Sequence, residues 1–240
     1  MKEVIICIAL LILIVTACSP EAPATEGPAI PVEEPTPTHI PMDLTPPQRA
    51  AVAALSESLN LPADEITFVS TEAVDWPDGC LGVAEEGLVC TQAITPGFRV
   101  ILEANGRQVE YRTNDDGTQI RPATIAMTWK REGGIAGFCD YMTVYLSGEV
   151  HVSSCKQGQY FEQRLIDVLS EDEIAKLDEW LGKYGNLNID ASDPKGVSDR
   201  MVVVLTFTGV GNDQTVTSSD QQELVKFAQE LHQRSSLSIK

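Results

Sequence analysis

The sequence predicts an α+β protein: two small domains, each with an antiparallel sheet plus helices, carried on a disordered Pro-rich stalk. Three observations support this fold class. Short turns join apolar segments that alternate like strands, amphipathic segments of helical period flank them, and a proline-rich acidic segment precedes both. Strands that meet through short turns pair antiparallel, because a parallel pair needs a long crossover connection. We therefore do not expect a parallel sheet.

The chain opens with a targeting segment over residues 1–17. An apolar run from Val4 to Val15 follows Lys2 and is shorter than the ~20 residues that cross a bilayer, so it suits an export signal. The sequence Val15-Thr16-Ala17-Cys18 resembles the bacterial lipobox. This resemblance implies cleavage before Cys18, diacylation of its thiol and acylation (palmitate-type) of the new amino terminus. A non-lipidated signal peptide with an incidental cysteine is the alternative.

Residues 18–45 form the lipidated cysteine and a linker. From Ser19 to Thr45 the chain has seven prolines, five acidic residues and no Lys or Arg. Such a segment cannot bury enough apolar surface to offset the entropy of ordering. Because proline favours extended polyproline II at about 3.1 Å per residue, we expect a stiff tether that holds the domains off the membrane.

Composition excludes several classes of function. The 240 residues include 17 Lys and Arg against 35 Asp and Glu, a net charge of -18. Nucleic-acid binding needs clustered cations that displace counterions, and a basic grip on anionic lipid needs the same. We expect no nucleic-acid partner, and membrane association only through the lipid anchor.

Six cysteines indicate an oxidising compartment. Cys7 leaves with the signal and Cys18 takes lipid, so an even set of four is left for disulfides: Cys80, Cys90, Cys139 and Cys155. Four cysteines allow three connectivities. The local one, Cys80–Cys90 with Cys139–Cys155, puts one bridge in each domain. The chain lacks the Cys-x-x-Cys pair of a redox-active site, and the spacings between its cysteines do not match a four-cysteine zinc site.

The first domain covers residues 46–122. Thr45 and Pro46 begin a helix whose apolar positions run to Leu59, and Pro62 ends it. A strand is expected over residues 66–74, followed by a turn-rich stretch closed at Cys90. Asn105-Gly106 is a strong hairpin signal. A two-residue turn pairs Ala104 with Arg107 and puts these apolar residues on one face: Phe98, Val100, Leu102, Val109 and Tyr111.

The second domain covers residues 123–240. A strand at 124–130 leads into a glycine-rich turn, Gly133 to Gly137, and a hairpin follows around Ser147-Gly148. A three-residue loop, 146–148, places Cys139 opposite Cys155 and gathers Met142, Val144, Val150 and Val152 on one face. The capping box of Ser170 and Glu173 begins a helix over 170–183. A buried strand at 201–207 and a helix at 219–234 complete the domain.

No constellation of catalytic residues is recognisable, and we expect no enzyme, no cofactor and no metal. The glycine turn lacks the Gly-Lys-Ser/Thr end of a phosphate loop. His151 lies within a strand without a nucleophile at a known spacing, His39 falls in the stalk, and His232 suits a helix C-terminus as a cation. Two acidic clusters could hold Ca²⁺, but neither has calcium-loop spacing, so solvated loops are favoured: Asp190, Ser192, Asp193, Asp199, and Asp75, Asp78, Glu85, Glu86.

The candidate partner-binding surface combines two features. One is the glycine turn, with Gly133, Gly134 and Gly137. The other is the outer face of the hairpin that follows, with Tyr141, Thr143, Tyr145 and His151, because aromatic residues supply contact area at low entropic cost. Coverage of that face by another part of the chain is the alternative.

Two further resemblances concern the domains. Residues 76–82, Thr95 to Val100 and Glu103 to Gly106 lie in a stretch from Pro46 to Arg121 that resembles a module of bacterial exported proteins without assigned activity. Residues 124–234 resemble emfourin-type protein inhibitors of thermolysin-like metallopeptidases. The similar parts are Arg131 to Gly137, the strand before them, the capped helix, a later strand and the closing helix. The Cys139–Cys155 hairpin and the surface anchor depart from that family.

We therefore expect an extracytoplasmic lipoprotein, anchored to the cell membrane through Cys18 (the outer membrane in a diderm cell), that acts as a binding or interaction module. The emfourin resemblance implies a peptidase partner, inhibited through the second domain. An uncharacterised hydrolase is a further alternative.

Overall fold

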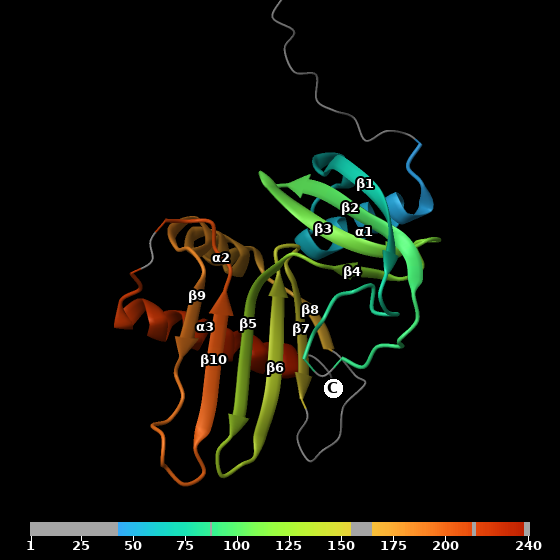
Figure 1. The fold of residues 1–240 in the computed structure, drawn as a ribbon. Coiled ribbons are helices and arrows are strands. Elements are labelled where there is room, and N and C mark those ends of the chain that lie inside the picture. The colour runs from blue at the N-terminus through green and yellow to red at the C-terminus, as the bar shows by residue number, and fades with distance from the viewer. Residues whose placement is uncertain (1–42, 87, 155–164, 213–214, 238–240) are drawn as a thin grey trace, which may run out of the picture. The chain divides into compact units, whose positions relative to one another are not determined.

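A computed structural model describes residues 43–86, 88–154, 165–212 and 215–237 (Figure 1). The predicted export signal, Cys18, the predicted stalk as far as Met42, and Cys155 lie outside the described residues. Residues Thr38–Lys240 cluster into one compact unit. The described chain has the predicted α+β architecture, with two antiparallel sheets and three α-helices.

The first sheet has four strands in the order β1-β2-β3-β4, packed against helix α1 (Pro46–Leu59). The strands are β1 (Thr67–Trp76), β2 (Thr95–Ala104), β3 (Arg107–Asn114) and β4 (Ile120–Pro122), and a 3₁₀ turn spans Ala63–Glu65. Helix α1 begins after Thr45, whose N–H donates to Gln48 Oε1, and ends at Asn60 in the left-handed conformation. The sequence did not predict β4, because three residues show no periodicity.

The predicted hairpin register of this sheet is confirmed. Ala104 pairs with Arg107, so the turn contains Asn105 and Gly106 alone. Val100, Leu102, Val109 and Tyr111 are buried together against α1, as the alternation requires.

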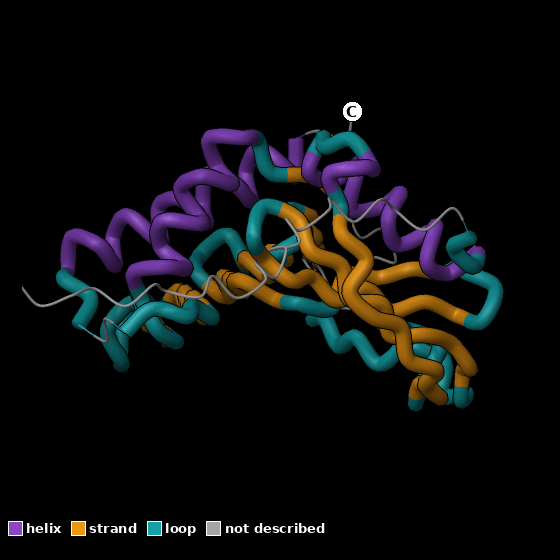
Figure 2. The backbone as a smooth tube through the Cα atoms, turned by 90° about the horizontal axis from the view of Figure 1, so that it is seen from above, coloured by secondary structure: helices purple, strands orange, loops and turns teal. Residues whose placement is uncertain are grey.

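The second sheet has six strands in the order β8-β7-β6-β5-β10-β9, all antiparallel. Its elements are β5 (Ile125–Gly133), β6 (Phe138–Tyr145), β7 (Glu149–Ser154), β8 (Leu165–Val168), α2 (Glu171–Lys183), β9 (Leu187–Asp190), β10 (Met201–Phe207) and α3 (Ser218–Leu237). Figure 2 shows the helices gathered on one side of the strands. Strands β8 and β9 were not predicted, because each has only four residues.

The predicted β6–β7 register is also confirmed. Met142 pairs with Val152 and Val144 with Val150, and all four side chains are buried. Cys139 is disulfide-bonded, and Cys155, its predicted partner, lies outside the described residues. In the first half, Cys80 is bonded to Cys90, as the local connectivity predicts.

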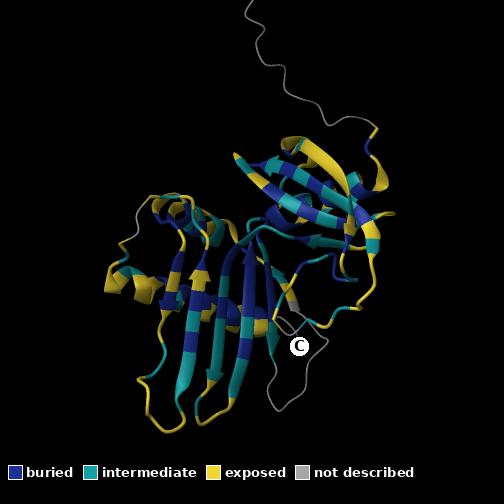
Figure 3. Cartoon of the chain, in the orientation of Figure 1, coloured by how far each residue is buried: buried dark blue, intermediate teal, exposed yellow. Residues whose placement is uncertain are grey.

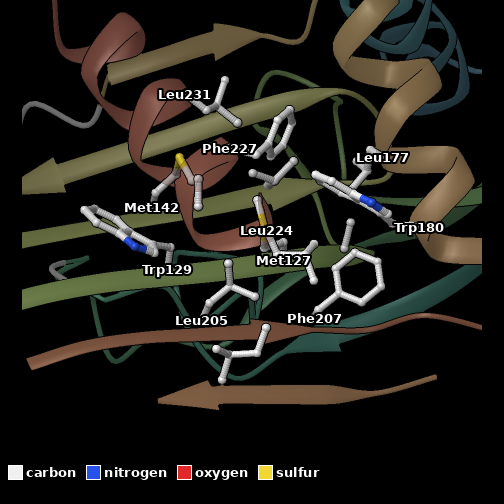
Figure 4. Packing of buried hydrophobic residues seen from close by; sticks show 14 of the residues in the cluster. Met127, Trp129, Met142, Leu177, Trp180, Leu205, Phe207, Leu224, Phe227 and Leu231 are labelled. Carbon is white, nitrogen blue, oxygen red and sulfur yellow. The ribbon is translucent and has the colours of Figure 1, made fainter. Parts of the chain in front are cut away.

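Two apolar cores lie beneath the sheets and meet at one place. The larger packs the second sheet against α2 and α3 around Trp129, Trp180 and Phe227 (Figure 4). The Trp180 and Phe227 rings meet edge to face, with centroids 5.1 Å apart. Leu146 and Ile174 pack against both cores, so the two sheets share apolar contacts. Figure 3 shows how burial alternates along the strands.

Candidate functional site

The glycine turn lies at one end of the second sheet and projects Ile135 into solvent. Gly133, Gly134 and Gly137 all have positive φ, which glycine adopts without strain. The turn is closed by Gly137 N–H, which donates to Gly134 O at 2.9 Å. Ile135 at its tip is 92% exposed, the largest exposure among the large apolar side chains described. The turn therefore presents an apolar side chain on a constrained backbone.

A second loop, residues 191–200 between β9 and β10, braces this turn. Gly134 N–H donates to Arg200 O at 3.2 Å, and a Cβ on Gly133 would collide with the same carbonyl. Within the loop, Arg200 Nε donates to Asp193 O at 2.7 Å and Met201 N–H to Asp193 Oδ2 at 2.9 Å. The two loops are thus joined by hydrogen bonds into one end of the sheet, which we call the two-loop end.

The base of the two-loop end is an ion pair packed on aromatic rings. The Arg131 guanidinium lies 3.8 Å from the Phe138 ring centroid and 2.6 Å from Asp140 Oδ2. Asp140 also accepts a hydrogen bond from Ser154 Oγ at 3.0 Å. These contacts hold β5 and β6 together immediately before the turn.

The first acidic cluster proposed for Ca²⁺ uses its carboxylates within the loop. Asp190 Oδ1 accepts from Ser192 N–H, and these hydrogen bonds from Ser192 lower the pKa of Asp190. Asp193 binds the backbone of Met201, and Asp199 has a left-handed φ of 55°. The Asp190 and Asp193 carboxylates therefore stabilise the loop by hydrogen bonds to its own backbone.

In the second acidic cluster, the Asp78 carboxylate accepts hydrogen bonds within its own loop. Within the described residues, one group of three ligands lies close together, Asp78, Cys80 and Cys90. Both of its sulfurs belong to the disulfide, and Asp78 Oδ1 accepts from the N–H groups of Cys80 and Gly82. The group is therefore the closure of the 80–90 loop.

The aromatic face is covered at Tyr145 and His151, so the prediction that these two residues are exposed is wrong. Tyr145 is fully buried and His151 is 3% exposed, and Glu85, from the loop after β1, contacts both side chains. Tyr141 stays half-buried, and its hydroxyl donates to Glu132 Oε1 at 2.6 Å. Coverage by another part of the chain, the alternative drawn from the sequence, is observed at Tyr145 and His151, whereas Tyr141 and Thr143 line a groove.

Glu85 is the residue through which the loop makes this contact. Its side chain is only 4% exposed, and its carboxylate accepts from Tyr145 OH at 2.8 Å. His151 Nδ1 lies 3.2 Å from both carboxylate oxygens, and Arg121 Nη1 lies 3.8 Å from Oε1. We call Glu85, Arg121, Tyr145, His151, Glu149 and Tyr111 the buried polar cluster.

The cluster continues to the far side of His151. His151 Nε2 lies 3.2 Å from Glu149 Oε2, and Tyr111 OH donates to Glu149 Oε1 at 2.8 Å. Burial, reinforced by the Glu149 charge, raises the pKa of Tyr111 well above its ordinary value. Through these contacts the cluster links β3 of the first sheet and Glu85 to β6 and β7 of the second sheet.

His232 was expected in the last turn of a helix, where a cation suits the dipole, but helix α3 continues to Leu237 and the side chain is buried. It is 8% exposed and its ring lies 5.0 Å from that of Trp129. Burial lowers the pKa of His232, although the nearby Asp140 charge opposes the shift. His39 lies outside the described residues.

A groove of about 460 Å³ lies on the sheet face opposite the helices. Its floor comes from β5, β6 and β10, and its wall from residues 84–86 of the loop that carries Glu85. The floor includes three threonines, Thr128, Thr143 and Thr206, together with Ile125, Val204, Lys130 and Tyr141. Lys130 is paired with Glu132 at 3.6 Å.

The sequence alone could not have found Glu85, because an isolated acid in a turn-rich loop is typical of solvent exposure. The only sequence signal is its place inside the Cys80–Cys90 loop. Ile135 was visible within the glycine turn, yet its exposure is a property of the folded hairpin.

In the ranges that the structure covers, no helix is both long enough and apolar enough to span a bilayer.

Comparison with known proteins gives one finding. Residues 48–122 match a protein family described as a domain of unknown function (DUF8738). This range contains all but the first two residues of α1 and the whole first sheet. No curated protein and no solved structure matches the chain.

Proposed function

We propose that this chain is a lipid-anchored interaction module outside the cytoplasm, and that it binds a protein partner through the two-loop end. The lipobox-like sequence Val15 to Cys18 supports the anchor. An acyl anchor is effective because each buried CH₂ contributes about 0.8 kcal/mol, so two or three chains hold a protein stably on a membrane.

The single observation that carries the binding role is Ile135. Its side chain is large, apolar and 92% exposed, so a partner that covers it removes apolar surface from water and lowers the free energy of the complex. The turn that presents it is braced by the 191–200 loop and by the Arg131–Asp140 pair, so binding orders little additional chain. Preorganisation of this kind improves affinity by reducing the entropic cost of association.

The binding role is tested with the soluble chain, residues 19–240. Leu44 is buried in the first core, so the fragment must retain it. Envelope and secreted proteins captured by this chain are purified, and the affinity of each is measured by calorimetry. We expect Ile135→Ser to weaken binding by about tenfold, the value of a buried aliphatic contact.

The matched control is Val210→Ser, because Val210 is also highly exposed, at 87%, and lies in the loop after β10. A partner whose affinity is unchanged by Ile135→Ser, or reduced equally by both variants, would refute the assignment of the two-loop end.

The anchor is tested separately with Cys18→Ser in the full chain. We expect the variant to move from the membrane fraction to the soluble fraction. Undiminished membrane retention would refute lipid anchoring at this residue.

Inhibition of a thermolysin-like metallopeptidase is the second candidate function. The observation that favours it is the placement of Arg131 to Gly137, the segment similar to emfourin-type inhibitors, in a braced and projecting hairpin. Titration of residues 19–240 into a thermolysin-like peptidase decides it. Stoichiometric loss of activity that Ile135→Ser weakens supports inhibition, and full activity at micromolar excess with no calorimetric binding refutes it.

A further inference from the structure

The segment that matches the family of unknown function, residues 48–122, meets the second half of the chain through side chains; we call it the family module. In the residues that the structure covers, no strand of one sheet pairs with a strand of the other, and each sheet has its own apolar core. Two residues, Ala123 and Thr124, lead from β4 to β5. This organisation is typical of two domains that dock on each other.

The turn of the β6–β7 hairpin lies against the end of α1. Ser58 Oγ donates to Ser147 O at 2.7 Å, and both residues are buried. Leu146 packs against both apolar cores. Gly148 has a φ of +84°, and a Cβ at this position would lie 3.1 Å from Leu59 Cδ2. Glycine therefore suits this turn both for its own conformation and for its close approach to the helix.

Side chains of the family module also contact both strands beside this turn. The Glu85 carboxylate accepts a hydrogen bond from Tyr145 OH at 2.8 Å and lies 3.2 Å from His151 Nδ1. On β7, Glu149 accepts a hydrogen bond from Tyr111 OH, also at 2.8 Å. The hairpin is thus contacted at its turn and on each of its two strands.

A charged pair lies beside the hairpin contact. Arg107, the first residue of β3, donates to Asp178 Oδ2 of α2 at 2.8 Å. Ile174, one helical turn before Asp178, packs against both cores. We call the contacting residues of the family module the docking face: Ser58, Leu59, Glu85, Arg107 and Tyr111.

We propose that the family module is a docking module for a β-hairpin, and that in this chain it holds the second half by non-covalent contacts. The docking face combines apolar packing, hydrogen bonds to buried polar groups and a partly exposed charged pair, as stable protein interfaces do. The hairpin that it fits has a glycine of positive φ in the turn, an acid directly after that glycine and a tyrosine three residues before it. The two-loop end lies at the other end of β6, so this role is separate from the binding role proposed above.

Cleavage of the chain between its halves tests the docking. A protease recognition sequence is placed between Ala123 and Thr124 of residues 19–240, and the folded protein is cut. We expect the two halves to elute together in gel filtration from about 100 to 1 μM. Arg107→Glu opposes two acids across the interface and should weaken the association of the cut halves by about tenfold or more. Asp178→Arg, added to Arg107→Glu, restores opposite charges and should recover most of this loss.

Arg99→Glu is the matched control. It makes the same charge change on the first sheet, where Arg99 pairs with Glu72 of the neighbouring strand at 2.8 Å, and it should leave the association unchanged. Circular dichroism must show that every uncut variant is folded, and it should show that the halves of the cut Arg107→Glu variant stay folded when they separate.

Parent halves that separate at 100 μM would overturn the proposal. Loss of structure in the separated halves would also overturn it, because the chain would then be one indivisible folding unit. Equal association of the Arg107→Glu and Arg99→Glu variants, or no recovery with Asp178→Arg, would show that the docking face does not hold the halves together.

Discussion

Replacement of Glu85 by alanine should destabilise the whole fold, although the residue lies in a loop. Its side chain is 4% exposed, and its carboxylate meets Tyr145 OH, His151 Nδ1 and Arg121 Nη1 within 3.8 Å. Glu85→Ala takes this acceptor from three side chains of the buried polar cluster. Removal of one partner from a buried charged pair costs about 3–5 kcal/mol.

Thermal unfolding measures this loss. A chain of this size loses about 2–4 °C in Tm for each kcal/mol, so Glu85→Ala should lower Tm by about 6–20 °C. Glu86→Ala is the matched control: it removes the same charge from the adjacent, exposed residue and leaves intact the Glu86 carbonyl that binds Ser153 Oγ. Its change should stay within about 0.5 kcal/mol. Equal shifts in the two variants would refute the claim that Glu85 joins the sheets.

Three other predictions follow from local geometry. Gly133→Ala should lower the free energy of unfolding in urea by about 1–3 kcal/mol, because φ is +85° and the new Cβ would meet Arg200 O. Gly182→Ala, in open space on α2, should raise it by about 0.5–1 kcal/mol, and changes of the same sign in both variants would contradict this reasoning. Burial lowers the pKa of His232, so as pH falls below 6.5 the unfolded chain binds a proton at this imidazole before the folded chain does, and the free energy of unfolding decreases. His232→Phe should reduce this pH dependence by at most about 1.4 kcal/mol per pH unit, and an unchanged slope would show that His232 does not cause it. The double variant C80A/C90A should lose about 2–3 kcal/mol, which reduction of the parent should match if the 80–90 loop is the one opened.

Local pattern was enough wherever neighbours along the chain decide the structure. The Asn105-Gly106 turn has a defined length, so it determined the β2–β3 register and the buried face of that hairpin. The capping box of Ser170 and Glu173 placed the start of α2 in the same way. Ser147-Gly148 determined the β6–β7 register, which buried Val144 and Val150.

The candidate site divides along the same line. The glycines of the turn after β5 were found from sequence because positive φ restricts residue choice at each position. The burial of Tyr145 and His151 was not predicted, because an outward-facing position in a strand says nothing about which distant loop covers it.

By itself, the sequence determined the antiparallel α+β class, the two hairpin registers, the capped helix and the first disulfide, all of which depend on residues close together along the chain. Only the tertiary structure decided that Glu85 enters the second sheet, that His232 is buried beside Trp129, and that β9 forms a free edge beside α3. These features join segments tens of residues apart. Their energies come from burial and from charge pairing across the fold, which no local pattern encodes.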